Sequence, residues 1–201
     1  MVQIPAQPRN DAVVTDKGQL NQQWVRYLEQ IASTAASAVQ TTGSKIVRTW
    51  SPTQASFPAT NYATLDTRNT HPVLDFNYIT QETAYFHGVM PDNYDATGIT
   101  VELWWTVTTV TSGTVGWDVS LELMTGLDID GDSFATAQTV TATTVSGTSG
   151  TVQSSSVSIA DGAAMDSLVA GSLFRLRIRR DVATDTAAND AELHMVEMRL
   201  Q

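Results

Sequence analysis

The chain contains no cysteine and carries very little positive charge. Its 201 residues include 11 Lys and Arg against 21 Asp and Glu, which gives a formal net charge of −10, and its only lysines are Lys17 and Lys45. The lack of cysteine excludes disulfides, thiolate metal ligands and cysteine nucleophiles. The acidic surface would repel a phosphate backbone, so we expect no nucleic-acid partner.

Long apolar runs and aromatic residues are also scarce. No stretch approaches the roughly 18 consecutive apolar residues that cross a bilayer, so we expect no membrane insertion. The first residues, MVQIPAQPRNDAVV, lack the basic segment and apolar stretch of a secretory signal. Charged residues make up 16% and aromatic residues 7% of the chain, whereas Thr, Ser, Ala and Val are abundant. This composition is typical of an all-β protein with Thr-rich strands.

The N-terminal part of the chain predicts an arm followed by a helix. Residues 1–18 contain prolines and no sustained apolar period, which indicates an extended arm. Residues 19–40 carry apolar side chains at helical spacing, namely Leu20, Trp24, Tyr27, Leu28 and Ile31. Within this set, Leu20, Trp24, Tyr27 and Ile31 also form a short heptad seam, as in a coiled coil. Because so short a helix is marginal alone, it needs a partner, either its own β domain or other copies of the chain.

The rest of the chain changes from irregular to alternating. Residues 41–72 are interrupted by Pro52, Pro58 and Pro72, which favours a linker or a wrapping segment with one or two short strands. From residue 73 onward, apolar and polar residues alternate in about eight runs separated by turn signals. We therefore predict a mainly β protein whose residues 73–201 form a jelly-roll or β-sandwich domain.

An acidic cluster is the best candidate for a metal site. Asp128, Asp130 and Asp132 alternate along the chain and could direct several oxygens at one calcium ion. The cluster is not an EF-hand loop, because its glycine falls at the fourth position and Thr139 occupies the twelfth. An exposed turn that aids solubility is the alternative, and we expect no other cofactor.

A second candidate is a ligand patch on the strands. Glu102, Trp104 and Glu122 lie opposite the main apolar set of their runs, so they could form a carbohydrate-binding or glycan-degrading patch. The alternative is the ordinary polar outer face of a sandwich. The three histidines, His71, His87 and His194, show no metal-ligand spacing, and no nucleophile motif is present. We therefore predict that the protein is not an enzyme and assign no catalytic residues.

The segment 175–180 carries an unusual row of arginines. Arg175, Arg177 and Arg179 would lie on one face of a strand, where an isolated row repels itself. The row therefore needs carboxylates on a neighbouring strand or on another subunit. Glu192 and Glu197 of the last predicted strand are the expected partners.

Several blocks together resemble virion proteins of tailed bacteriophages and prophages. The blocks are PDNY at 91–94, GITVELWW at 98–105, VGWDV at 115–119, DSF at 132–134 and LFRLRIRRD at 173–181. The resemblance covers roughly residues 85–200, and such proteins carry a β-sandwich head. The N-terminal arm and Trp-containing helix are also similar to those of short phage fibres and spikes, in which the arm docks on the virion and the helix trimerises.

The resemblance implies a structural component of the virion, assembled in the host bacterial cytoplasm. The expected form is a homotrimeric short fibre or spike that contacts glycans of the host surface. Ile4, Pro5 and Pro8 would anchor the arm to a portal, adaptor, tail or major capsid protein, and Leu20, Trp24, Tyr27, Leu28 and Ile31 would lie inside the trimer. A capsid decoration (cement) protein is the first alternative. A carbohydrate-binding module or glycan-degrading enzyme is the more distant one.

Overall fold

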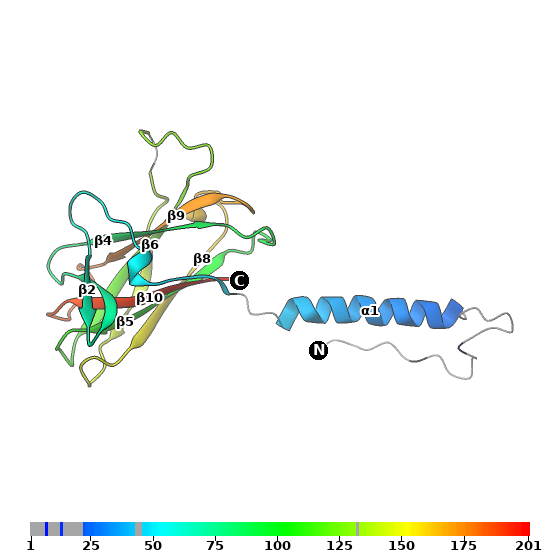
Figure 1. Ribbon diagram of the computed structural model, residues 1–201, viewed down its shortest axis with the longest axis horizontal. Coiled ribbons are helices and arrows are strands. Elements are labelled where there is room, and N and C mark those ends of the chain that lie inside the picture. Colours follow the sequence, from blue (N-terminus) through cyan, green and yellow to red (C-terminus); the bar gives the residue numbers. More distant parts are fainter. Residues whose placement is uncertain (1–6, 8–12, 14–21, 43–45, 132) are drawn as a thin grey trace. The chain divides into compact units, whose positions relative to one another are not determined.

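The computed structural model describes residues 7, 13, 22–42, 46–131 and 133–201 (Figure 1). The chain divides into two compact units, Met1–Ser44 and Lys45–Gln201. The sequence-predicted anchoring residues Ile4, Pro5 and Pro8 lie outside the described residues, and so does Leu20.

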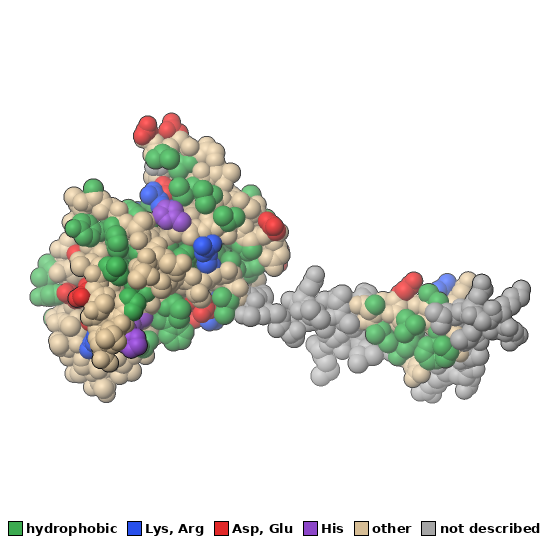
Figure 2. Space-filling view, viewed as in Figure 1, with side chains coloured by type: hydrophobic (Ala, Val, Ile, Leu, Met, Phe, Trp, Pro, Cys, Tyr) green, Lys and Arg blue, Asp and Glu red, His purple; other side chains and the backbone are tan. Residues whose placement is uncertain are grey.

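The first unit contains helix α1 (Gln22–Thr42), close to the predicted range of 19–40. Trp24 and Tyr27 pack edge to face with ring centroids 5.7 Å apart, and Leu28 is 48% exposed. Hydrophobic side chains gather on one side of this helix (Figure 2). The described part of the chain holds no helix that is both long and apolar enough to cross a membrane.

The second unit is a sandwich of two antiparallel sheets, which confirms the predicted mainly β fold (Figure 1). The larger sheet has the order β2-β3-β10-β5-β8, with β1 also paired to β10, and the smaller sheet has the order β4-β9-β6-β7. The large-sheet strands are β1 (Ile46–Trp50), β2 (Thr64–Arg68), β3 (His71–Phe76), β5 (Ile99–Val107), β8 (Gln153–Ile159) and β10 (Ala191–Leu200). The small-sheet strands are β4 (Thr83–Val89), β6 (Thr114–Leu123), β7 (Gln138–Thr144) and β9 (Leu173–Arg180), and the short 3-10 helices are η1 (Pro52–Gln54) and η2 (Ala163–Met165).

The core lies between the two sheets and follows from the alternation of the sequence. Each strand sends every second side chain inward, because successive residues of a strand point to opposite faces. Trp105 of β5 and Trp117 of β6 meet across the sandwich with ring centroids 6.4 Å apart, and Phe76 of β3 meets Trp117 edge to face at 5.1 Å. All three side chains are fully buried. The residues between them in sequence therefore form the outer faces of the two sheets.

The sandwich begins earlier than residue 73. Strands β1 and β2 lie within the segment 41–72, for which the prolines indicate a linker or a wrapping segment with one or two short strands, and both belong to the larger sheet. Trp50 of β1 pairs with Val196 of β10, is 2% exposed and donates from Nε1 to the carbonyl oxygen of His87 at 2.9 Å. Apart from Trp50, the side chains of β1 and β2 are exposed or half-buried, so their sequences lack the apolar alternation of a core strand.

A buried ion pair closes one end of the core. Arg180, the last residue of β9, is fully buried and its Nε donates to Asp185 Oδ2 at 2.5 Å. The same guanidinium donates to the carbonyl oxygens of Phe76, Ala187 and Asn189 at 2.8–3.0 Å. These contacts hold the β9–β10 loop against β3.

Candidate functional site

The sequence-predicted ligand patch is not brought together. Glu102 and Trp104 lie on the outer face of the large sheet, whereas Glu122 lies on the outer face of the small sheet, on the far side of the core. Glu122 is 2% exposed and bound to Arg175, and Glu102 is bound to Arg199 at 3.1 Å. The pattern of alternation correctly indicates outward residues but cannot tell to which sheet each strand belongs.

The predicted calcium ligands do not form a metal site within the described residues. Asp128 and Asp130 lie in an exposed turn, where the amide of Asp130 donates to Asp128 Oδ1 at 3.2 Å. No group of three metal-ligating side chains occurs in the part of the chain that the structure describes. Asp132 lies outside that part.

A pocket of about 360 Å³ opens on the outer face of the large sheet. It is lined by Arg68, Asn69, His71, Thr106, Gly150, Val152 and His194. These residues come from β2, β3 and the turn between them, from β5 and β10, and from the loop between β7 and β8. Strands distant in sequence thus place two histidines, an arginine and a hydroxyl around one cavity.

A tight hairpin sets one wall of the pocket. Arg68 and His71 are paired across the β2–β3 hairpin, and the two loop residues between them, Asn69 and Thr70, have φ values of 46° and 69°. Two positive φ values are the geometry of a type I′ turn, whose twist matches that of the strands. A β-branched residue is strained in this conformation, so Thr70 stores backbone strain in the turn next to Asn69, which lines the pocket.

Arg68 is held rigidly by the wall opposite the hairpin. Its Nη1 donates to the carbonyl oxygen of Val107 at 2.9 Å and binds Glu192, and its Nη2 donates to the carbonyl oxygen of Thr108 at 2.9 Å. A Cβ at Gly150, whose φ is +75°, would lie 2.9 Å from Arg68 Nη2, so a side chain there would push the guanidinium away. The charge of Arg68 is balanced by Glu192, which also accepts a hydrogen bond from Thr106 Oγ1 at 2.6 Å.

His194 faces the pocket because of an irregularity in β10. The register of β10 against β5 shifts between Leu193 and Met195, so that His194 is the extra residue of a bulge. Its Nε2 lies 3.0 Å from Thr106 Oγ1 on the outer face. Burial lowers the pKa of His194, and Arg68 and His71 add to this effect against the opposing influence of Glu192. The imidazole is therefore neutral at pH 7 and can both donate and accept a hydrogen bond.

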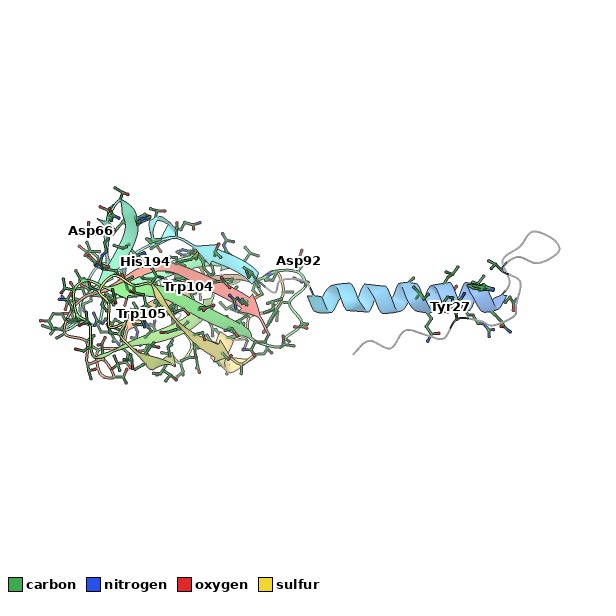
Figure 3. All side chains as sticks on the ribbon, turned by 90° about the horizontal axis from the view of Figure 1, so that it is seen from below. Tyr27, Asp66, Asp92, Trp104, Trp105 and His194 are labelled. Atoms are coloured by element: carbon green, nitrogen blue, oxygen red, sulfur yellow. The ribbon has the colours of Figure 1, made fainter. Side chains whose placement is uncertain are left out.

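Trp104 lies beside the pocket on the same face. It is two residues from Thr106 on β5 and pairs with Met195 on β10, and Figure 3 shows it next to His194. Its indole is half-buried, and Nε1 is buried without a hydrogen-bond partner among the described residues. Met195 is 38% exposed. Together Trp104 and Met195 form an apolar surface at the edge of the polar pocket.

A carboxyl group with a raised pKa, that of Asp75, lies on the neighbouring part of this face. Asp75 of β3 pairs with Glu192 of β10 and with Thr64 of β2. Burial, followed by the charges of Glu192, Asp66 and Asp190, raises the pKa of Asp75 to about 6. A raised carboxyl pKa means that the ionised form is disfavoured in the folded state. The free energy of unfolding is therefore lowered by Asp75 as the pH rises from its ordinary pKa of 3.8, and the whole loss is present above about pH 6.

The arginine row lies on the small sheet and has different partners from those expected. Arg175 binds Glu122 at 2.5 Å and Arg179 binds Asp118 at 3.1 Å, both on β6. Glu192 and Glu197 lie on β10 in the other sheet, where they bind Arg68 and Arg199. The expectation that they neutralise the row is therefore wrong, because β9 is flanked by β4 and β6 and not by β10.

The pocket was not predicted from the sequence. Arg68, His71, Thr106 and His194 are spread over more than 120 residues, and no motif links them. From the sequence alone, each histidine is an ordinary surface or strand residue. Only the pairing of β3 with β10 and of β10 with β5 brings them together.

Comparison with known proteins gives distant likenesses of fold. No family model matches the chain, and no curated protein matches it. A family 35 carbohydrate binding module from an environmental isolate aligns at 10% identity and a TM-score of 0.46, over 76% of this chain and 92% of that one. The xylan-binding module CBM15 aligns at 9% identity and a TM-score of 0.44, over 79% and 97%. The CBM22-1 xylan-binding domain of Paenibacillus barcinonensis Xyn10C aligns at 12% identity and a TM-score of 0.42, over 79% and 96%. At TM-scores below 0.5, these likenesses carry no conclusion about what this chain binds.

Proposed function

We propose that the β-sandwich is a non-catalytic carbohydrate-binding domain whose site is the pocket beside Trp104. The observation that supports this proposal is that a polar pocket and an apolar aromatic surface lie next to each other on the outer face of the large sheet. A cavity of about 360 Å³ presents Arg68, His71, His194 and Thr106, and the half-buried indole of Trp104 adjoins it. A few fixed polar groups next to an apolar surface are typical of small-molecule sites.

The chemistry of these groups suits a neutral sugar. Imidazole, guanidinium and hydroxyl groups exchange hydrogen bonds with sugar hydroxyls, while an indole offers an apolar face to the C–H groups of a sugar ring. The charge of Arg68 is already balanced by Glu192, and His194 is neutral at pH 7. The pocket therefore carries no excess charge that would favour an ionic ligand.

The same contacts favour binding over catalysis. Glu192 is held by Arg68 and by Thr106 Oγ1, and it is 4% exposed. A carboxylate held by these contacts is not free to approach a glycosidic oxygen. Glycoside hydrolysis by the common mechanisms needs two carboxyl groups flanking the scissile bond.

Titration with neutral oligosaccharides tests the site. We expect at least one of cellohexaose, xylohexaose and maltohexaose to bind in calorimetric titrations, and Trp104→Ala and His194→Ala each to weaken that binding about tenfold or more, as for buried anchor residues at other interfaces. Phe57→Ala is the matched control, because Phe57 is a 40% exposed aromatic that packs on Tyr62 away from the pocket. Binding that Trp104→Ala and His194→Ala leave unchanged would place the sugar elsewhere, and no binding by any of the three oligosaccharides would contradict the proposal.

We propose, as a second function, that helix α1 carries the sandwich as part of a multimer, with a homotrimer as the expected form. The supporting observation is its apolar side, where Trp24, Tyr27 and Ile31 recur at heptad spacing and the adjacent Leu28 is 48% exposed. Attachment to a virion, as a fibre or spike or as a capsid decoration protein, rests on the sequence resemblance and stays a prediction.

The mass of the protein in solution, measured by sedimentation, tests whether α1 forms a multimer. We expect the full chain to sediment as a trimer and a chain starting at residue 45, the boundary of the second unit, to sediment as a monomer. In the full chain, Leu28→Asp should shift the population toward monomer, because a carboxylate cannot be buried in an apolar seam. A monomeric full chain would contradict the multimer, and a trimeric truncated chain would move its contacts to the sandwich.

A further inference from the structure

The outer face of the small sheet is built from three rows of side chains across strands β4, β9 and β6. The first row is His87, Arg175 and Glu122, the second is Tyr85, Arg177 and Ser120, and the third is Thr83, Arg179 and Asp118. Each row thus places one arginine of β9 between a residue of β4 and a residue of β6. The rows differ in how the arginine is neutralised.

The two outer rows are balanced and the middle row is not. Arg175 pairs with Glu122, and Arg179 pairs with Asp118. Arg177 has Tyr85 on one side and Ser120 on the other, and within the described residues no carboxylate lies within ion-pair distance of it. Its guanidinium carbon lies 4.4 Å from the ring centroid of Phe134, which contributes a cation–π contact but no opposite charge.

The surroundings of Arg177 make this lack of a counter-charge costly. The side chain is half-buried, and burial, followed by the charge of Arg179, lowers its pKa against the opposing influence of Tyr85, Asp118 and Glu122. Arg177 Nε and the hydroxyl oxygen of the facing Ser120 are both buried without a hydrogen-bond partner among the described residues. An arginine in a partly buried position normally has its charge and its donors satisfied. The middle row therefore lacks an acceptor that carries negative charge.

The neighbouring groups restrict what that acceptor can be. Asp118 and Glu122 flank the middle row and would repel a ligand with several negative charges. Tyr85 and Ser120 lie on either side of the guanidinium, but the Ser120 hydroxyl is buried, so only Tyr85 offers a hydroxyl group to a ligand. Tyr85 also stacks on Phe134, with ring centroids 5.5 Å apart and an interplanar angle of 10°. A single carboxylate on an otherwise neutral, hydroxyl-bearing molecule fits this setting best, because the planar guanidinium matches the two oxygens of a carboxylate.

We infer that Arg177 binds the carboxylate of an acidic sugar, a uronic acid, on the outer face of the small sheet. The guanidinium would hold the carboxylate, and the hydroxyl of Tyr85 would exchange a hydrogen bond with a ring hydroxyl. This site is separate from the pocket beside Trp104, which lies on the other sheet, and it does not depend on a sugar binding there. The two faces of the sandwich would then take sugars of different charge.

Titration of the full chain with methyl β-D-glucuronide tests this inference, with methyl β-D-glucoside as the neutral counterpart. We expect the glucuronide to bind and the glucoside to bind at least tenfold more weakly. Arg177→Gln should weaken glucuronide binding at least tenfold, and Arg177→Lys should restore only part of it, because an ammonium lacks the planar pair of donors. Binding should also weaken as the salt concentration rises.

Two controls separate this site from general charge effects and from the other pocket. Arg48→Gln removes an arginine of the large sheet that lies over Trp50, and it should leave glucuronide binding unchanged. Trp104→Ala should also leave it unchanged, even if neutral oligosaccharides no longer bind. Thermal unfolding reports whether each variant is folded, and we expect Arg177→Gln to unfold no earlier than the parent chain, since it removes an unbalanced charge.

Three outcomes would overturn the inference. One is equal binding of the glucuronide and the glucoside, which would mean that no carboxylate is recognised. Another is glucuronide binding that folded Arg177→Gln and Arg177→Lys leave intact. The third is binding of a tetraglutamate peptide with no binding of the glucuronide, which would assign the arginine to a protein partner instead of a sugar.

Discussion

Replacing Asp185 by Asn is expected to lower the free energy of unfolding of the sandwich by about 3–5 kcal/mol. Asp185 is the only charged partner of Arg180 among the described ion pairs, and both side chains are almost completely shielded from water, with exposed fractions of 2% and 0%. The substitution keeps the shape of the side chain but leaves the guanidinium charge unbalanced in the interior. It also turns an amide donor or a neutral oxygen toward Arg180 Nε, which had a carboxylate oxygen at 2.5 Å.

Chemical denaturation of Asp185→Asn, compared with a variant in which an exposed ion pair is broken, measures this effect. Glu102→Gln is the matched control, because its pair with Arg199 is partly exposed, with side-chain exposures of 18% and 43%, and it should cost no more than about 1 kcal/mol. The double variant Arg180→Met/Asp185→Leu should recover most of the loss, since apolar side chains of similar volume can replace a buried pair. A loss below about 1 kcal/mol in Asp185→Asn would show that water reaches this ion pair.

Local alternation was enough to predict the strands from β3 onward but not which strands lie next to each other. The periodicity of two placed Arg175, Arg177 and Arg179 on one face of a strand, as the structure confirms. It also suggested the last strand as the source of their carboxylates, but β9 lies between β4 and β6. Which strands become neighbours depends on the order of the sheets, and nothing in a single strand's sequence encodes it. Arg180 follows the same alternation inward, where an arginine is tolerated only because Asp185 and three carbonyl groups meet it.

The candidate sugar pocket could not be predicted either, because it also depends on the order of the strands in the sheet. His71 and His194 are 123 residues apart, and no local motif in the sequence marks either of them. They meet at one cavity only through the sheet order and the bulge at His194. Trp104 could be placed on an outer face from alternation alone, whereas the grouping of Glu102 with Glu122 required knowing that β5 and β6 belong to different sheets. Outward-facing residues are thus predictable from sequence, and sites built from several strands are not.

Truncating Trp117 to Ala is expected to cost about 3–5 kcal/mol, comparable to the loss of the buried ion pair. Trp117 lies at the centre of the sandwich, fully buried between Phe76 and Trp105 of the opposite sheet. Alanine would leave a large cavity that neither sheet can close, because the strands are held in register on both sides of β6. Trp117→Ala therefore loses both the transfer free energy of the indole and its packing contacts.

Comparing the stability costs of substituting tryptophans in different surroundings tests whether the core between the sheets is the main source of stability. Trp117 Nε1 has no hydrogen-bond partner among the described residues, so Trp117→Phe removes volume without breaking a bond. Trp105 Nε1 donates to Ser155 Oγ at 2.9 Å, so Trp105→Phe should cost about 1 kcal/mol more than Trp117→Phe. Trp24→Ala, in the separate helical unit, should leave the unfolding transition of the sandwich unchanged. Equal costs for Trp117→Ala and Trp104→Ala in equilibrium denaturation would mean that the core between the sheets is not the main source of stability.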